Sequence, residues 1–155
     1  MKHLNYLFIV LLLAFWGTKV QASVINETDH FFCGFDSEEE FNLWKKVDIN
    51  GLAGNGNSDW WWDGRGGAFI SVGPDVGIDD WLISPEIALT GGKKYVIKTK
   101  FYRSEAAGTI RFTMGSTAEP GGQTTIIKEL ENYSGESYLK FSLPENIESG
   151  KYFFG

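Results

Sequence analysis

DDWLISPEI at residues 79–87 is the stretch that decides the fold, and ALTGGKKY at residues 88–95 follows it directly. Its apolar part, residues 81–83, is typical of a short strand, and Pro85 has no backbone N–H to offer a neighbouring strand. Gly91-Gly92 then favours a turn. The order of strand, corner, turn and strand predicts an all-β domain.

Alternating side chains extend this pattern along the chain. Between Tyr95 and Arg103, the apolar Ile97 and Phe101 share the face that we expect to look inward. Alanine and glycine at residues 106–108 predict a hairpin between this strand and the next. We expect one all-β domain at residues 23–155, a two-sheet β-sandwich of the jelly-roll type. The other predicted strands are 31–35, 68–72, 110–114, 124–127, 138–143 and 151–154.

One short helical turn interrupts the predicted strands. Ser37 and Glu40 have the spacing of a capping box, and Phe41 and Trp44 would share one face of the turn. The acids at residues 38–40 suit the positive end of a helix dipole, so they need no catalytic explanation.

The N-terminus indicates export. Residues 1–22 combine Lys2, an apolar run from Leu7 to Trp16, and an ending Val20-Gln21-Ala22, which predicts a signal peptide cleaved after Ala22. An apolar run of about ten residues is shorter than the roughly 20 that a membrane-spanning helix needs. We therefore expect a secreted or cell-surface protein without a membrane span.

The exported chain is acidic and has a single cysteine. Removing residues 1–22 from a chain with 14 basic and 20 acidic residues takes away two lysines and no acid, so the formal charge changes from −6 to −8. Such a charge repels a phosphate backbone, which argues against a nucleic-acid partner. Cys33 cannot form an internal disulfide, and its phenylalanine neighbours favour a buried, inert thiol.

Residues 48–59, DINGLAGNGNSD, are dense in oxygen-bearing side chains and glycine. Calcium favours flexible loops of this composition. The loop is not an EF-hand, because Ala53 stands where that motif needs glycine and Asp59 stands where it needs glutamate. A solvated turn rich in Asn and Gly explains the same residues equally well.

Three consecutive tryptophans, Trp60, Trp61 and Trp62, follow this loop, with Asp63 and Arg65 next to them. In an extended segment Trp60 and Trp62 would point to one face and Trp61 to the other. At least one indole is then expected near the surface, where it could stack on a sugar ring while Asp63 and Arg65 bind hydroxyl groups. The alternative is that two indoles fill the core and the third packs under a loop.

The inventory of reactive groups argues against an enzyme. His30 is the only histidine after residue 22, and no nucleophile elbow, metalloprotease helix or phosphate loop is present. Acidic residues are plentiful enough to supply the carboxylate pair of a glycoside hydrolase, and the sequence does not give their separation. Surface carboxylates are, however, usually solvated or bind cations.

The two motifs at residues 79–95 resemble those of the cleaved-adhesin or choice-of-anchor (MAM-like) jelly-roll modules of secreted Bacteroidetes proteins. The resemblance covers residues 31–155. It implies a non-catalytic, adhesin-like module that binds a host protein or glycan and holds structural calcium near its first strand. The positions that match the family's acidic pattern are Asp36, Asp48, Asp59, and Asp79 or Asp80, of which we select Asp80.

Two related functions stay open alongside the adhesin. The module could be a carbohydrate-binding accessory domain of a secreted hydrolase or protease, or a purely structural spacer. Family members usually continue past the strand at residues 151–154 to a closing strand, so we also expect that the C-terminal strand is missing here and that an unpaired sheet edge is left at residues 151–154.

Overall fold

The computed structural model describes residues 31–51, 59–71, 79–103 and 108–155. The predicted signal peptide at residues 1–22 lies outside the described residues, as do residues 52–58 of the oxygen-rich loop and 104–107 of the predicted hairpin turn. None of the helices within the described ranges is long and apolar enough to cross a membrane.

The stretch at residues 79–87 forms the corner that the sequence predicts. β4 (Asp80–Ile83) ends there and β5 (Ile87–Leu89) begins, with Ser84 and Pro85 between them. β4 pairs with β1 (Lys45–Asp48), whereas β5 pairs with β10 (Gly150–Phe154). Ser84 joins the two pairings: its N–H donates to the carbonyl of Phe154 at 2.7 Å, and its Oγ accepts from the N–H of Phe154 at 2.9 Å.

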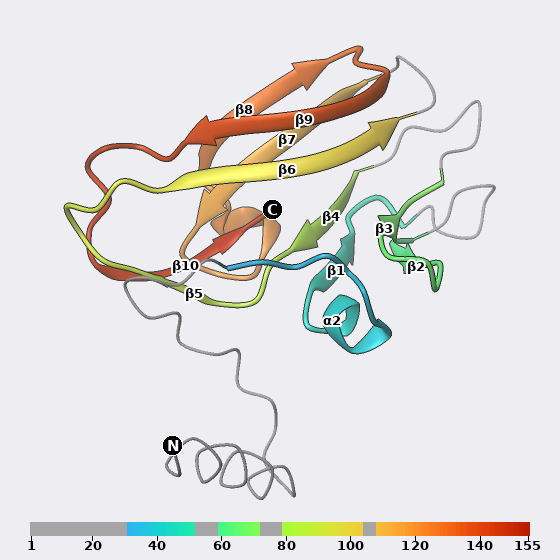
Figure 1. Cartoon of the computed structure of the whole chain (residues 1–155), viewed down its shortest axis with the longest axis horizontal. Helices are drawn as coiled ribbons and strands as arrows, with labels where there is room; N and C mark the ends of the chain where they lie inside the picture. The colour runs from blue at the N-terminus through green and yellow to red at the C-terminus, as the bar shows by residue number, and fades with distance from the viewer. Residues whose placement is uncertain (1–30, 52–58, 72–78, 104–107) are drawn as a thin grey trace, which may run out of the picture.

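The larger layer is an antiparallel sheet with the strand order β5-β10-β7-β8, in which β7 is Thr109–Gly115 and β8 is Thr125–Glu131. β10 lies inside this sheet (Figure 1) and pairs with β5 on one side and β7 on the other. The unpaired edge predicted at residues 151–154 is therefore wrong. β5 pairs with residues 150–152 of this strand and β7 with residues 153–154, and Gly155 extends the pairing to β7 through two backbone hydrogen bonds with Thr113.

β6 (Val96–Arg103) and β9 (Gly135–Ser142) form the second layer (Figure 1). The predicted alternation of β6 is confirmed, since Val96, Lys98, Lys100 and Tyr102 are the exposed members. The opposite face packs toward the larger sheet, so the all-β sandwich is confirmed. Its buried core consists of Ile87, Leu89, Met114, Leu143 and Ile147.

The hairpin predicted around residues 106–108 is wrong. β6 pairs with β9 over its whole length, and β7 pairs with β8 and β10. The aromatic rings of Phe101 and Phe112 face each other between the layers, with centroids 5.9 Å apart. Burying these two apolar faces against each other takes the chain from one layer to the other instead of into a hairpin.

The N-terminal described segment differs in part from its prediction. Residues 31–36 form no strand, and Phe35 has a φ of 54°, which an extended strand does not allow. The capping box is confirmed: Ser37 caps α2 (Glu38–Asn42) by accepting from the N–H of Glu40 at 3.2 Å. Glu40 accepts in turn from the N–H of Asp36 at 3.1 Å. β1 follows α2 where the sequence pattern predicts no strand.

Candidate functional site

An exposed aromatic pair lies on the small hairpin of β2 (Trp61–Trp62) and β3 (Ala68–Phe69). Trp61 is directly opposite Phe69, and their ring centroids are 5.4 Å apart at an interplanar angle of 35°. Exposed fractions of 42% for Trp61 and 39% for Phe69 leave much of both rings open to solvent. We call this pair the Trp61–Phe69 surface.

The other two indoles lie deeper in the molecule. Trp62 is half-buried and donates its indole N–H to the carbonyl of Phe35 at 2.7 Å. Trp60 is also half-buried, and its indole N–H is enclosed without an acceptor among the described residues. The structure thus places Trp61 as the surface member, and none of the three belongs to the buried core.

Asp63 and Arg65 form a closed unit in the turn after Trp62. Asp63 accepts from the backbone N–H of Arg65 at 2.9 Å and from its guanidinium Nε at 2.8 Å. The backbone N–H is the main cause that holds the pKa of Asp63 below its usual value. The Asp63 side chain is 4% exposed and that of Arg65 85%. Asp63 therefore orients Arg65, and only Arg65 of the two is open to a ligand.

Three of the four predicted calcium ligands influence one another. Asp48 and Asp80 are directly opposite in the β1–β4 pair. The pKa of Asp80 is raised, first by burial and then by the charges of Asp48, Asp59 and Asp79. Like charges opposite each other on paired strands destabilise the pairing. We call these four carboxylates the acidic cluster.

Hydrogen bonds hold three members of the acidic cluster in place. Asp48 Oδ1 accepts from the backbone N–H of Gly51 at 2.7 Å, and Asp59 Oδ1 accepts from the backbone N–H of Trp60 at 2.7 Å. Asp79 Oδ1 accepts from the indole N–H of Trp81 at 3.2 Å. Within the described ranges, no group of three or more such side chains converges closely enough to hold a metal ion.

Asp36 lies apart from this cluster. A Cβ atom placed on Gly66 would be 3.5 Å from its Oδ1, so Asp36 sits beside the turn that follows β2. It is not among the carboxylates that raise the pKa of Asp80. The predicted calcium set is thus divided between two places, with Asp36 in one and Asp48, Asp59 and Asp80 in the other.

Two members of these sites are absent from the set predicted by sequence. Phe69 completes the aromatic surface, and Asp79 adds a fourth charge near Asp80. Alternation through the strand after Gly66-Gly67 could have indicated Phe69, but no local pattern pairs it with Trp61. The sequence offers Asp79 only as an alternative to Asp80, whereas the structure brings both into the cluster.

We compared the chain with family models, with curated proteins and with solved structures. The resemblance to cleaved-adhesin modules rests on residues 79–95 and stays a prediction, because none of these three comparisons found a match.

Proposed function

We propose that this chain is a secreted or cell-surface, non-catalytic binding module of adhesin type that recognises a glycan. The observation that carries the proposal is the exposed cross-strand pair of Trp61 and Phe69. Aromatic rings offer large rigid contact faces that lose little conformational entropy on binding, and the apolar faces of sugar rings fit such surfaces.

The hairpin that carries the pair is well anchored. Trp62, next to Trp61, is tied to the Phe35 carbonyl, and Asp63 fixes the direction of Arg65. Such preorganisation lowers the entropy cost of binding. The exposed guanidinium of Arg65 retains N–H groups that can donate to sugar hydroxyls or to a carboxylate.

The acidic side chains of these sites already have hydrogen-bond partners, which favours binding over catalysis. The carboxylate of Asp63 is occupied by Arg65, and three of the clustered acids accept hydrogen bonds from neighbouring N–H groups. A jelly-roll topology and a place within a multidomain adhesin are part of this proposal. An accessory domain of a secreted hydrolase would use the same surface, whereas a structural spacer would bind no glycan.

The first test replaces Trp61 by Ala. We expect binding to neutral oligosaccharides to weaken about 30-fold, because a central aromatic anchor typically contributes about 2 kcal/mol. The melting temperature should change little, since the ring is 42% exposed. Binding is measured by calorimetry with the cello-, xylo- or manno-oligosaccharide that a glycan array selects.

Tyr102→Ala is the matched control, because Tyr102 is a 72% exposed aromatic residue on β6. Equal affinity of the two variants would contradict a Trp61–Phe69 site. Binding to a host matrix protein but to no glycan would replace glycan recognition with protein recognition. Binding to neither would favour the spacer.

We further propose calcium as a structural cofactor at the acidic cluster. The donors are carboxylate oxygens, which calcium prefers, and a divalent cation would relieve the repulsion among them, which adds to burial in raising the pKa of Asp80. Because no three of these groups converge in the described ranges, binding would require side-chain or loop adjustment. Asp48, Asp59 and Asp80 are the proposed ligands, with Asp79 next to them and Asp36 outside the cluster.

The calcium proposal predicts a pH-dependent effect of Asp80→Asn. A raised pKa in the folded state means that Asp80 favours folding in acid and that this contribution is lost as pH rises through the raised pKa. Without calcium, the variant should therefore melt at a higher temperature than the parent at pH 7. The difference should vanish below the ordinary value of 3.8, where the parent is protonated in both states.

Calcium should reverse this order. At about 100 times its dissociation constant, a ligand that binds only the folded state stabilises it by about 2.7 kcal/mol. The parent should gain this stability, and Asp80→Asn should gain clearly less. The measurement is a set of melting curves at several pH values with calcium or with chelator. A parent melting temperature that ignores both would remove calcium from the proposal.

A further inference from the structure

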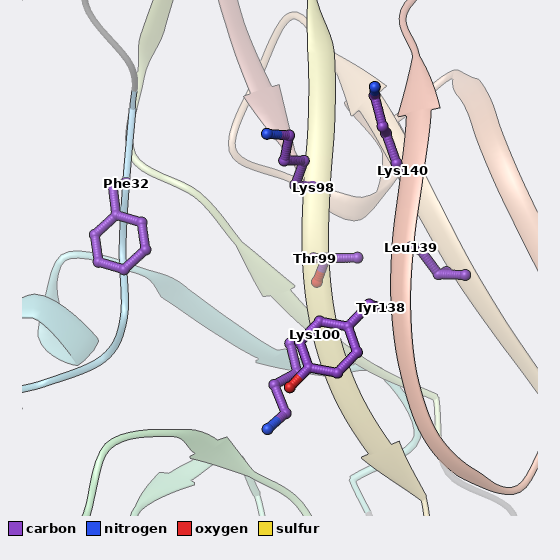
Figure 2. Close-up of a pocket in the computed structure, with 7 residues that line it drawn as sticks. All are labelled: Phe32, Lys98, Thr99, Lys100, Tyr138, Leu139 and Lys140. Atoms are coloured by element: carbon purple, nitrogen blue, oxygen red, sulfur yellow. The ribbon is translucent and has the colours of Figure 1, made fainter.

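A second site lies on the exposed face of the β6–β9 layer. Figure 2 shows a groove there, with Lys98 and Lys100 on β6, Tyr138 and Lys140 on β9, and Phe32 on the N-terminal segment. Its volume is about 330 Å³. Thr99 and Leu139 complete the lining. We call it the lysine groove.

The strand register places two positive charges directly opposite each other in this groove. Lys98 pairs with Lys140, and the next exposed pair is Lys100 with Tyr138. Lys100 is neutralised by Glu136, whose carboxylate is 2.6 Å from its Nζ. Within the described part of the chain, Lys98 and Lys140 have no carboxylate partner. Because like charges across a strand pair destabilise it, these lysines favour a counter-charge from outside the chain.

Aromatic rings lie next to these charges. Tyr138 is 74% exposed and Phe32 is 78% exposed, and both line the groove. The Nζ of Lys100 lies 5.1 Å from the centroid of the Tyr138 ring, which holds that cation over the ring face. The groove thus combines uncompensated positive charge with exposed aromatic faces.

We propose that the lysine groove binds an acidic polysaccharide whose sugar rings carry carboxylate or sulfate groups. Lys98 and Lys140 bind the anionic group by charge-assisted hydrogen bonds, and Tyr138 and Phe32 contact the sugar rings. This site is independent of the Trp61–Phe69 surface, which lies on the β2–β3 hairpin and not on the β6–β9 layer.

Charge and size favour a polysaccharide over an acidic protein. The whole chain has a formal charge of −6, so an acidic protein surface would be repelled outside the groove. A stable protein interface also uses about 20–30 residues on each partner, whereas seven residues line this groove. A single polysaccharide chain contacts the lysines and rings without covering the acidic surroundings.

The test compares two double variants that remove the same charge. Lys98→Gln with Lys140→Gln empties the groove of its free cations, and Lys94→Gln with Lys128→Gln removes two exposed lysines outside the groove. The probes are polygalacturonate and dextran sulfate oligosaccharides, with neutral dextran as reference. We expect the groove variant to bind the acidic probes at least about tenfold more weakly, from the loss of two charge-assisted contacts, and the control variant to stay within about twofold.

Three further readouts distinguish binding in the lysine groove from binding elsewhere on the protein. Affinity of the parent should fall as salt rises, and Trp61→Ala should keep its affinity for the acidic probes. The groove variant should melt no lower than the parent, because a repulsive pair has been removed. Equal losses in both double variants, binding of poly-glutamate as tight as that of the polysaccharides, or no binding of either acidic probe would each overturn the proposal.

Discussion

Gly115→Ala should prevent stable folding. Gly115 ends β7, where it pairs with Phe153 of β10, and the chain then returns past it through residues 120–123. A Cβ atom at this position would overlap the carbonyl oxygen of Gly122, and it would lie 2.6 Å from the carbonyl carbon of Gly122 and 2.8 Å from the Cα of Gln123. These are backbone atoms, so no side-chain rotation relieves the overlap. We expect a loss of roughly 3 kcal/mol or more.

Gly121→Ala is the control for this substitution. Gly121 lies in the same returning segment, but a Cβ atom there would meet nothing within 4 Å. Circular dichroism melting curves of both variants check the prediction. If Gly115→Ala melts as the parent does, the close approach of residues 115 and 122 does not exist in solution.

Ile83→Ala has the next largest expected effect, a loss of about 2–5 kcal/mol in the free energy of unfolding. Ile83 is fully buried at the end of β4, next to the Ser84 corner that connects the β1–β4 and β5–β10 pairings. Removing most of its side chain would leave a cavity where these pairings meet. Urea unfolding measures the loss.

Ile83→Val provides a graded comparison, since removing one methylene group should cost only about 0.5–1.5 kcal/mol. Leu43→Ala serves as a surface control, because Leu43 is 43% exposed. A cost for Ile83→Ala that is no larger than that for Leu43→Ala would contradict the buried position of Ile83.

Local patterns in the sequence were sufficient to predict much of the fold. The alternation from Tyr95 to Arg103 predicted which side chains of β6 face outward, and Ser37 with Glu40 predicted the cap of α2. Both depend on residues a few positions apart, whose relation is set by backbone geometry. The same applies to the triple tryptophan, for which alternation predicted that at least one indole lies near the surface.

The candidate sites depended more on long-range pairing. Trp61 meets Phe69 only through the hairpin register, and Asp48 meets Asp80 because β1 pairs with β4. Local composition did suggest aromatic and acidic sites, whereas the resemblance to cleaved-adhesin modules added Asp36, which lies outside the acidic cluster. The residues next to a given position in the sequence do not determine which distant residue will lie opposite it in a sheet.

The sequence by itself determined the strands from β6 to β10, the corner at residues 84–85 and the outward face of β6, but it did not predict β1. Only the tertiary structure decided that β10 is an interior strand, that β6 pairs with β9 instead of β7, and that Lys98 lies opposite Lys140. A period of two specifies a face but not a partner, because any strand with an apolar face can complete the same core. The partner is selected when all apolar faces and all backbone hydrogen bonds must be satisfied together.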